Sequence, residues 1–412
     1  MCGVVCILEK LPSPCPSQEG NSSIFPPGRG KGWVKIMAAT KYDYTLKDAM
    51  TMPVTPVEIQ QFDIARYAAY ADECDQRYAE FLRKDEGIAV WQRVRAGEVF
   101  RDQCRNMRQS LRWQLGALTR SLEYLTDAPT YLEPWYGIGT TASMFGADYE
   151  WPSGQAPVVK PLYHSLEEIP QLIPRESQDV PILRYTLDTI TYFLEQTQGR
   201  IPMSWCDIQS PINVVGGLVD ITQFFLAFYE QPEKVNAILA PLADAVISFT
   251  RQQSALIGEV LARPGHGFGS SRQGIGIGLS TDNLIMISPK MYTAFCVADT
   301  ARIGEHFGGT AIHSCGNWGK WLQAVKKIPN LMMVDGAFSP QTDPAYNKCE
   351  EFRDALVNTG IVLHARLVGE PEDVLARVNR LWKPGLKLMI GTHEQNPQAQ
   401  RQLYHAIHQF CA

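Results

Sequence analysis

Residues 311–334 read AIHSCGNWGKWLQAVKKIPNLMMV, and this stretch decides the fold. The apolar run at 311–313 predicts a short buried strand, the run at 318–327 predicts a helix, and the apolar run at 331–334 predicts a second strand. Two strands of one sheet that are joined by a crossover helix run parallel to each other. The stretch therefore indicates an α/β fold with a parallel sheet.

The same alternation of strand and helix recurs about eight times from residue 130 onward. The strand-like runs are 131–136, 201–206, 266–270, 284–287, 311–313, 331–334, 361–364 and 388–390. The helix-like runs are 218–230, 232–257, 289–307, 318–327, 346–359, 371–381 and 397–410. This count predicts a closed (β/α)8 TIM barrel, and an open doubly wound sheet is the alternative.

A glycine-rich run, GIGIG at 274–278, bears on that alternative. A doubly wound nucleotide-binding fold would place the spacing G-x-G-x-x-G between a strand and a helix. The run does not have this spacing, and no clear strand leads directly into it. We interpret it as a flexible loop of the barrel.

The chain divides into three parts. Residues 10–33 are rich in Pro, Ser and Gly and cannot bury enough apolar surface to order themselves, which predicts that residues 1–36 form a flexible tail. Residues 56–125 carry apolar side chains at i, i+3 and i+4 spacing, which predicts that residues 37–128 form an N-terminal helical region that packs on the barrel. Residues 129–412 are expected to form the barrel.

Composition and charge exclude several classes of partner. The net charge of −5 over 412 residues does not indicate nucleic acid binding. No apolar run reaches the ~20 residues of a membrane span, and the N-terminus lacks the features of a secretory signal. The ten cysteines are scattered, which fits a reducing compartment. We therefore expect a cytoplasmic protein with a small-molecule partner, and neither a nucleic acid nor a membrane partner.

His313 and Cys315 stand at the end of the strand predicted at 311–313. Side chains two positions apart in a strand project to the same side, and imidazole and thiolate are preferred zinc donors. Barrel enzymes keep their chemistry at the C-terminal ends of the strands. The pair therefore predicts half of a metal site. The alternative is a buried cysteine beside a hydrogen-bonded histidine.

Four segments carry a resemblance to a known family. They are DIQSP at 207–211, DN at 282–283 with ISPKMY at 287–292, IHSCGN at 312–317, and DGAFSP at 335–340. In this order they resemble the uroporphyrinogen decarboxylase superfamily, which includes zinc-dependent methyltransferases that act on methyl-corrinoid proteins. The resemblance covers about residues 130–410 and implies the (β/α)8 barrel.

The two branches of that superfamily differ in their site residues. The decarboxylases hold their tetrapyrrole with an RQAGR-type arginine loop, which has no clear counterpart here, because Arg93, Arg95 and Arg101 lie in a helical context. The methyltransferases place a third zinc ligand, a cysteine, after the last strand. In this chain His393 stands at about that position, and Glu394 is the next candidate. The resemblance is nearer to the methyltransferase branch.

The resemblance implies a zinc ion held by His313, Cys315 and His393, unless the metal of the family has been lost. A thiol at the zinc would lose its proton and attack the methyl group of a corrinoid (cobalamin). The implied catalytic residues lie at predicted strand ends and are Asp207, Asp282 and Asp335. The implied cofactor-binding residues are Trp205, Gln209, Asn317 and Arg366.

The expected partners are a small-molecule methyl acceptor and a corrinoid, either free or on a corrinoid protein. Two other functions stay open: decarboxylation of a tetrapyrrole, as in uroporphyrinogen decarboxylase, and non-catalytic binding of a corrinoid or tetrapyrrole. Metal content separates the first function from the decarboxylase, and turnover of methylcobalamin separates it from a binder.

Overall fold

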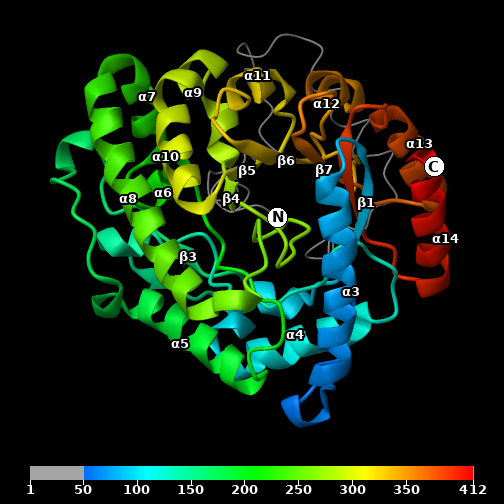
Figure 1. Cartoon of the computed structure of the whole chain (residues 1–412). Coiled ribbons are helices and arrows are strands. Elements are labelled where there is room, and N and C mark those ends of the chain that lie inside the picture. Colours follow the sequence, from blue (N-terminus) through cyan, green and yellow to red (C-terminus); the bar gives the residue numbers. More distant parts are fainter. Residues whose placement is uncertain (1–50, 412) are drawn as a thin grey trace, which may run out of the picture.

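Six parallel strands form the central sheet of the protein, seen in a computed structural model that describes residues 51–411 (Figure 1). Their order across the sheet is β1-β8-β7-β6-β5-β4. The strands are β1 (Gly87–Gln92), β4 (Ile277–Ser280), β5 (Thr310–His313), β6 (Leu331–Ala337), β7 (Val362–Arg366) and β8 (Lys387–Thr392). A separate antiparallel pair is formed by β2 (Tyr149–Glu150) and β3 (Val158–Val159).

Two irregular segments join β1 to β4 and close the sheet into a barrel. The connecting backbone contacts are Asp127 N to Val90 O at 2.7 Å and the parallel bridges Leu132–Met203 and Gln209–Ser280. These segments make isolated bridges instead of continuous ladders. Together with the six strands they complete the eight positions of the ring, so the predicted (β/α)8 barrel is confirmed.

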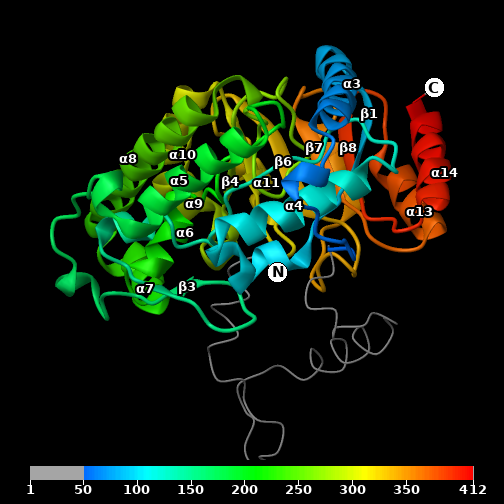
Figure 2. The same cartoon turned by 90° about the horizontal axis from the view of Figure 1, so that it is seen from below.

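Helices surround the barrel on its outside (Figures 1 and 2). They are α3 (Ile64–Arg83), α4 (Met107–Ser121), α5 (Pro181–Gln196), α6 (Pro211–Val214), α7 (Ile221–Glu230), α8 (Pro232–Ile257), α9 (Pro289–Phe295), α10 (Val297–Phe307), α11 (Leu322–Val325), α12 (Cys349–Leu356), α13 (Pro371–Leu381) and α14 (Pro397–His408). Helices α8 and α13 begin and end where the sequence predicts. None of the helices within residues 51–411 is long and apolar enough to cross a membrane.

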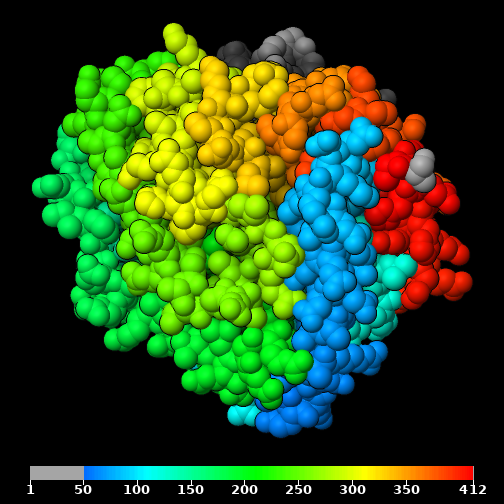
Figure 3. Space-filling view, viewed as in Figure 1, coloured from blue at the N-terminus to red at the C-terminus, as the bar shows by residue number. Residues whose placement is uncertain are grey.

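Side chains of the strands alternate between the interior of the barrel and the helices outside it. The interior cluster contains Ala89, Trp91, Ala311, Met333, Val362 and Met389. Tyr78 and Phe81 of α3 belong to the same cluster, and α3 lies lengthwise on the surface of the molecule (Figure 3). The carbonyl of Leu82 accepts a hydrogen bond from Nζ of Lys387, at the start of β8, at 2.7 Å. Helix α3 therefore closes the barrel at the end where the strands begin.

Two strands predicted between residues 260 and 290 are wrong. The run at 284–287 falls mostly in a 3-10 helix, Asp282–Met286, and the run at 266–270 is a turn and irregular chain. Both runs are apolar because they bury side chains in the core, as Leu284 does. A four- or five-residue apolar run has no periodicity that separates a strand from a helical turn.

A strand that the sequence did not predict, β4, begins within the glycine run at 274–278, so the interpretation of that run as a loop is correct for 274–276 and wrong for 277–278. A Cβ atom on Gly278 would lie 2.6 Å from the ring of Phe268 and 2.9 Å from the carbonyl oxygen of Pro264. Only glycine permits this close packing. Because a glycine has no apolar side chain, the strand is inconspicuous in the sequence.

Strand β1 lies within residues 37–128, for which the sequence predicts a helical region. All six of its residues, GIAVWQ, are buried. The sheet therefore begins before the predicted boundary at residue 128. Arg93 and Arg95 follow β1 directly, so their predicted helical context is wrong. The predicted tail, 1–36, lies outside the described residues.

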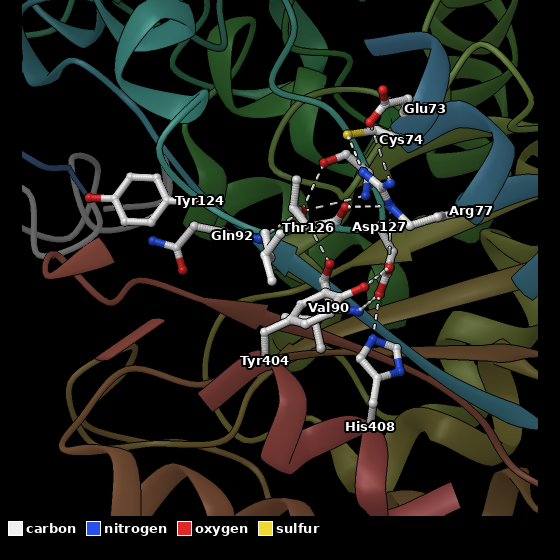
Figure 4. A network of polar contacts seen from close by, with 12 residues as sticks. Glu73, Cys74, Arg77, Val90, Gln92, Tyr124, Thr126, Asp127, Tyr404 and His408 are labelled. Atoms are coloured by element: carbon white, nitrogen blue, oxygen red, sulfur yellow. Dashed lines mark hydrogen bonds and ion pairs between the residues drawn. The ribbon is translucent and has the colours of Figure 1, made fainter. Parts of the chain in front are cut away.

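Asp127 ties the first strand to the last helix (Figure 4). Its Oδ2 accepts the backbone N–H of Val90 at 2.7 Å, and its Oδ1 accepts the hydroxyl of Tyr404 at 2.6 Å. Nε2 of His408 lies 2.9 Å from Oδ2. This buried carboxylate thus joins β1 to α14 across most of the length of the chain.

Candidate active site

Polar side chains gather where β4, β5, β6 and β7 end. In the parallel register Ser280 pairs with His313, His313 with Asp335, and Asp335 with His364. Neighbouring side chains at the same level of a parallel sheet lie close together. The fold therefore brings residues from four strands to one edge, at the C-terminal mouth of the barrel, where barrel enzymes hold their active sites.

A group of three possible metal ligands lies at this mouth. The ligand atoms of Asp282, His313 and Cys315 all lie within 4.8 Å of one another. Nε2 of His313 is 3.6 Å from Sγ of Cys315 and 3.5 Å from Oδ1 of Asp282. Asp282 and His313 are buried, whereas Cys315 is partly exposed. The group therefore offers one oxygen, one nitrogen and one sulfur donor, of which the sulfur belongs to a partly exposed residue.

Local hydrogen bonds hold the Cys315 loop in this position. Oδ1 of Asp282 accepts the backbone N–H of Cys315 at 2.8 Å, and Asp343 accepts the N–H of Gly316 at 2.8 Å. Gly316 has a φ of 72°, in the left-handed region that glycine adopts without strain. The HSCGN sequence thus leaves β5 in a turn that directs the Cys315 side chain back towards His313.

Asp335 on β6 stands behind His313 and is contacted by three nitrogen-bearing side chains. It forms a short contact with Nδ1 of His313 and lies 2.8 Å from Nδ1 of His364 and 3.1 Å from Nε of Arg366. Burial alone would raise the pKa of Asp335, but Arg366 and His313 lower this pKa well below its usual value. We therefore assign a carboxylate that accepts Nδ1–H of His313, which leaves Nε2 as the donor nitrogen facing Cys315.

A second polar group lies at the same mouth. It consists of Glu133 and Asp207, which lie on the irregular segments, and of His266, which lies in the chain before β4. Nδ1 of His266 is 2.7 Å from Oε2 of Glu133, and its Nε2 is 3.6 Å from Oδ2 of Asp207. Burial would raise the pKa of Glu133, but His266 and Arg95 lower it. Burial raises the pKa of Asp207, and His266 opposes this shift.

Two amide side chains connect the second group to the first. Gln209 donates to Oδ1 of Asp207 at 2.6 Å and accepts from Nδ2 of Asn213 at 2.9 Å. The same Nδ2 lies 3.1 Å from Oδ2 of Asp282. Because all of these side chains are buried, the two groups form one connected polar wall of the mouth.

Several residues predicted for the site do gather in it. Asp207, Asp282, Asp335 and Gln209 belong to the polar wall. Arg366 is also present, as an internal ion pair of Asp335.

Other predicted residues lie elsewhere. His393 is not brought into the metal group: its Nε2 and Nδ1 lie 2.9 Å and 3.2 Å from the carbonyl oxygens of Thr51 and Arg93. Glu394 accepts the backbone N–H of Asn396. The Asn317 side chain is exposed and carries no described contact with the site.

Trp205 is in the core and not at the mouth. Its indole donates to Ser254 of α8 at 2.8 Å and packs against Phe307 of α10. Like Met203 two positions earlier, it faces the surrounding helices, as strand periodicity requires. The implied role of Trp205 in binding a cofactor is therefore wrong.

Three residues of the site, Glu133, Asn213 and His266, are not among the site residues predicted from the sequence. For Glu133 a signal was present, because an acidic residue interrupts the apolar run predicted as a strand at 131–136. A carboxylate inside such a run is buried and requires a partner. No comparable local signal marks Asn213.

Enzymes with a (β/α)8 barrel have their active sites at the C-terminal ends of the strands. The polar side chains described above gather at the same ends in this protein. The sequence of residues 91–262 matches the model of the uroporphyrinogen decarboxylase (URO-D) family. The segment DIQSP at 207–211 lies within this match. The expected resemblance to the uroporphyrinogen decarboxylase superfamily is thereby confirmed.

Among solved structures, the fold is similar to that of a methyltransferase from Methanosarcina mazei. The two share 14% sequence identity with a TM-score of 0.57, over 82% of this chain and 99% of that chain. A pyruvate carboxylase from Rhizobium etli gives 8% identity and a TM-score of 0.29, over 87% of this chain and 30% of that chain. No curated protein matches the chain significantly. The similarity to the Methanosarcina mazei methyltransferase concerns the fold.

Proposed function

We propose that this protein is a methyltransferase that moves a methyl group from a methyl-corrinoid to a thiol or similar acceptor. The observation that carries the proposal is the group of His313, Cys315 and Asp282 at the barrel mouth, with Asp335 behind His313. The similarity in fold to the Methanosarcina mazei methyltransferase supports it.

The three donors fit zinc, which accepts imidazole nitrogen, thiolate sulfur and carboxylate oxygen. A catalytic zinc site has three protein donors and an open position, and a zinc ion bound here would stabilise the deprotonated form of an acceptor thiol. We propose Asp282 as the third donor instead of His393, because both ring nitrogens of His393 lie against backbone carbonyl groups.

The chain's own residues prepare the site for this chemistry. Asp335 fixes the orientation of His313, and the hydrogen bond from the Cys315 backbone fixes the loop. The partly exposed Cys315 faces the mouth, through which a corrinoid, free or on a partner protein, would approach. The scattered cysteines support the proposal that the protein works in the cytoplasm.

A second candidate function is decarboxylation of a tetrapyrrole. It is favoured by Arg93 and Arg95, which follow β1 at the barrel mouth, where cationic side chains could meet substrate carboxylates. Arg95, however, lies 3.9 Å from Glu133 and 3.4 Å over the ring of Phe100, so its charge is partly compensated within the protein. We therefore place this function second.

Zinc content and methyl transfer, measured on the same preparations, test the proposal. The wild type supplied with zinc should retain about one ion per chain and should demethylate methylcobalamin when a thiol is added. Cys315→Ala should lose both properties without a change in melting temperature. Cys411→Ala, which removes an exposed cysteine near the C-terminus, is the matched control and should keep both.

Two results would contradict the proposal. The first is a wild-type protein that retains no zinc and transfers no methyl group. The second is catalytic release of carbon dioxide from uroporphyrinogen without methyl transfer, which would establish the second candidate.

A further inference from the structure

We infer that His266, oriented by Glu133, accepts the proton that the methyl acceptor loses, an inference that rests on the proposed function. The reaction needs such a group, because a thiol must release its proton before or while its sulfur is methylated. Neither residue belongs to the metal group at the strand ends.

The contact with Glu133 defines the tautomer of His266. Oε2 of Glu133 lies 2.7 Å from Nδ1, and Glu133 is a buried carboxylate with a lowered pKa, so it accepts the proton on Nδ1. In a neutral imidazole with hydrogen on Nδ1, the other nitrogen, Nε2, carries a lone pair. A buried carboxylate that orients a histidine in this way is a recurring arrangement for a general base.

The position of Nε2 suits proton transfer with a substrate. It lies 3.6 Å from Oδ2 of Asp207, which is longer than a hydrogen bond. The His266 side chain is 18% exposed, whereas those of Glu133 and Asp207 are 8% and 7% exposed. Of the three side chains, the imidazole is thus the most accessible from the mouth.

Aromatic rings and the surrounding loop hold the imidazole in place. Trp135 stacks on it at an interplanar angle of 26°, and Phe100 meets it edge-on at 62°. The hydroxyl of Tyr131 donates to the carbonyl oxygens of Gly265 and Phe268, on either side of His266, at 2.7 Å and 3.0 Å. A base held in one orientation loses little entropy when the substrate binds.

Two carboxylates lie against the ring of His266. The carboxylates of Glu133 and Asp207 face its two nitrogens, and their attraction to an imidazolium exceeds that to a neutral ring. Arg95 lies 3.9 Å from Glu133 and, with Arg93, acts on the same carboxylate. The two arginines help to keep Glu133 ionised.

In the proposed step, the S–H bond of the acceptor breaks and its proton passes to Nε2 of His266. A sulfur electron pair forms the new S–CH3 bond. The cobalt–carbon bond of the methyl-corrinoid breaks, and its electron pair remains on cobalt, which is reduced from Co(III) to Co(I). The imidazolium then releases the proton to solvent through the mouth.

The experiment measures the rate of methyl transfer from methylcobalamin to 2-mercaptoethanol between pH 5.5 and 9, with zinc content determined in parallel. The wild-type rate is expected to rise with pH over this range. His266→Gln should lower the rate by about 10²-fold or more and make this rise smaller. Glu133→Gln should lower it in the same direction. Imidazole added to His266→Ala should restore part of the rate, which a merely structural role would not allow.

His306→Gln is the matched control, because it removes an exposed histidine of α10. It should leave both the rate and the pH profile unchanged. If the wild type transfers methyl groups and His266→Gln keeps the wild-type rate and profile, the role of His266 is refuted and the proposed function stands. If His266→Ala is slow but imidazole has no effect, the inference is also refuted. If the wild type itself transfers no methyl group, the proposed function and this inference fail together.

Discussion

Asp335 shows how much one buried carboxylate determines at the scale of single residues. It contacts His313, His364 and Arg366, which come from two neighbouring strands. Burying a charge is costly unless partners compensate it. Here the partners keep the carboxylate ionised, and the carboxylate in turn selects which nitrogen of His313 faces Cys315. Asp335, which is not one of the three possible metal ligands, thus determines that Nε2 is the donor atom of His313.

Asp335→Asn should therefore weaken zinc binding without removing any ligand. The expected loss is about 10- to 100-fold in affinity, because an amide no longer fixes the tautomer of His313 and leaves Arg366 uncompensated. Competition with a chromophoric chelator measures this affinity. Asp354→Asn, at an exposed ion pair with Arg353, is the control. Equal zinc affinity in Asp335→Asn and the wild type would show that Asp335 does not orient the ligand.

At the scale of elements, the barrel depends on contacts that fasten irregular segments to regular ones. Only six of the eight ring positions are continuous strands. Beside β1 the ring is held by Asp127, whose side chain accepts from the backbone of Val90 and from two side chains of α14 (Figure 4). A side chain here replaces part of the hydrogen bonding that a regular ladder would supply.

Asp127→Ala should destabilise the protein by about 2–4 kcal/mol, because it leaves a buried N–H and two further groups without their acceptor. Tyr404→Phe removes one of these hydrogen bonds and should cost only about 1 kcal/mol. Urea unfolding followed by circular dichroism compares the two variants. Equal unfolding midpoints for the two variants would show that the carboxylate does not fasten β1 to α14.

At the scale of the whole molecule, helix α3 serves as the floor of the barrel. Tyr78 and Phe81 enter the cluster of interior side chains, and Lys387 at the start of β8 bonds to the backbone of α3. The polar mouth lies at the opposite end of the same strands. The interior between them is filled by side chains, as in other barrels of this type.

Phe81→Ala should destabilise the whole protein by about 3–5 kcal/mol, because it opens a cavity in the closed end of the barrel. Glu80→Ala, at an exposed neighbour on the same helix, should change stability little. Thermal melts of both variants give the comparison. A melting temperature of Phe81→Ala equal to that of Glu80→Ala would mean that α3 is not part of the barrel core.

Local sequence patterns were sufficient for much of this protein. The strands at 311–313, 331–334, 361–364 and 388–390 and the bounds of α8 follow from periodicity, because a regular element repeats its burial pattern within a few residues. The pair His313 and Cys315 was likewise predictable, since two residues of one strand end share a side. The (β/α)8 barrel was predicted from the count of eight alternations, although two of the counted strands, 266–270 and 284–287, are not strands and β1 and β4 complete the ring in their place.

The tertiary structure alone decided the rest. Glu133 and His266 are 133 positions apart and meet only because the ring closes between them. Asp282 takes the place beside His313 that the sequence assigned to His393, because a 3-10 turn after β4 directs its carboxylate there. Strand β4 was inconspicuous in the sequence because its central Gly278 is required by close packing against Phe268 and Pro264, and not by a local pattern. The packing of the whole barrel determines which residues that are far apart in the chain come close together. A short stretch of sequence does not contain this information.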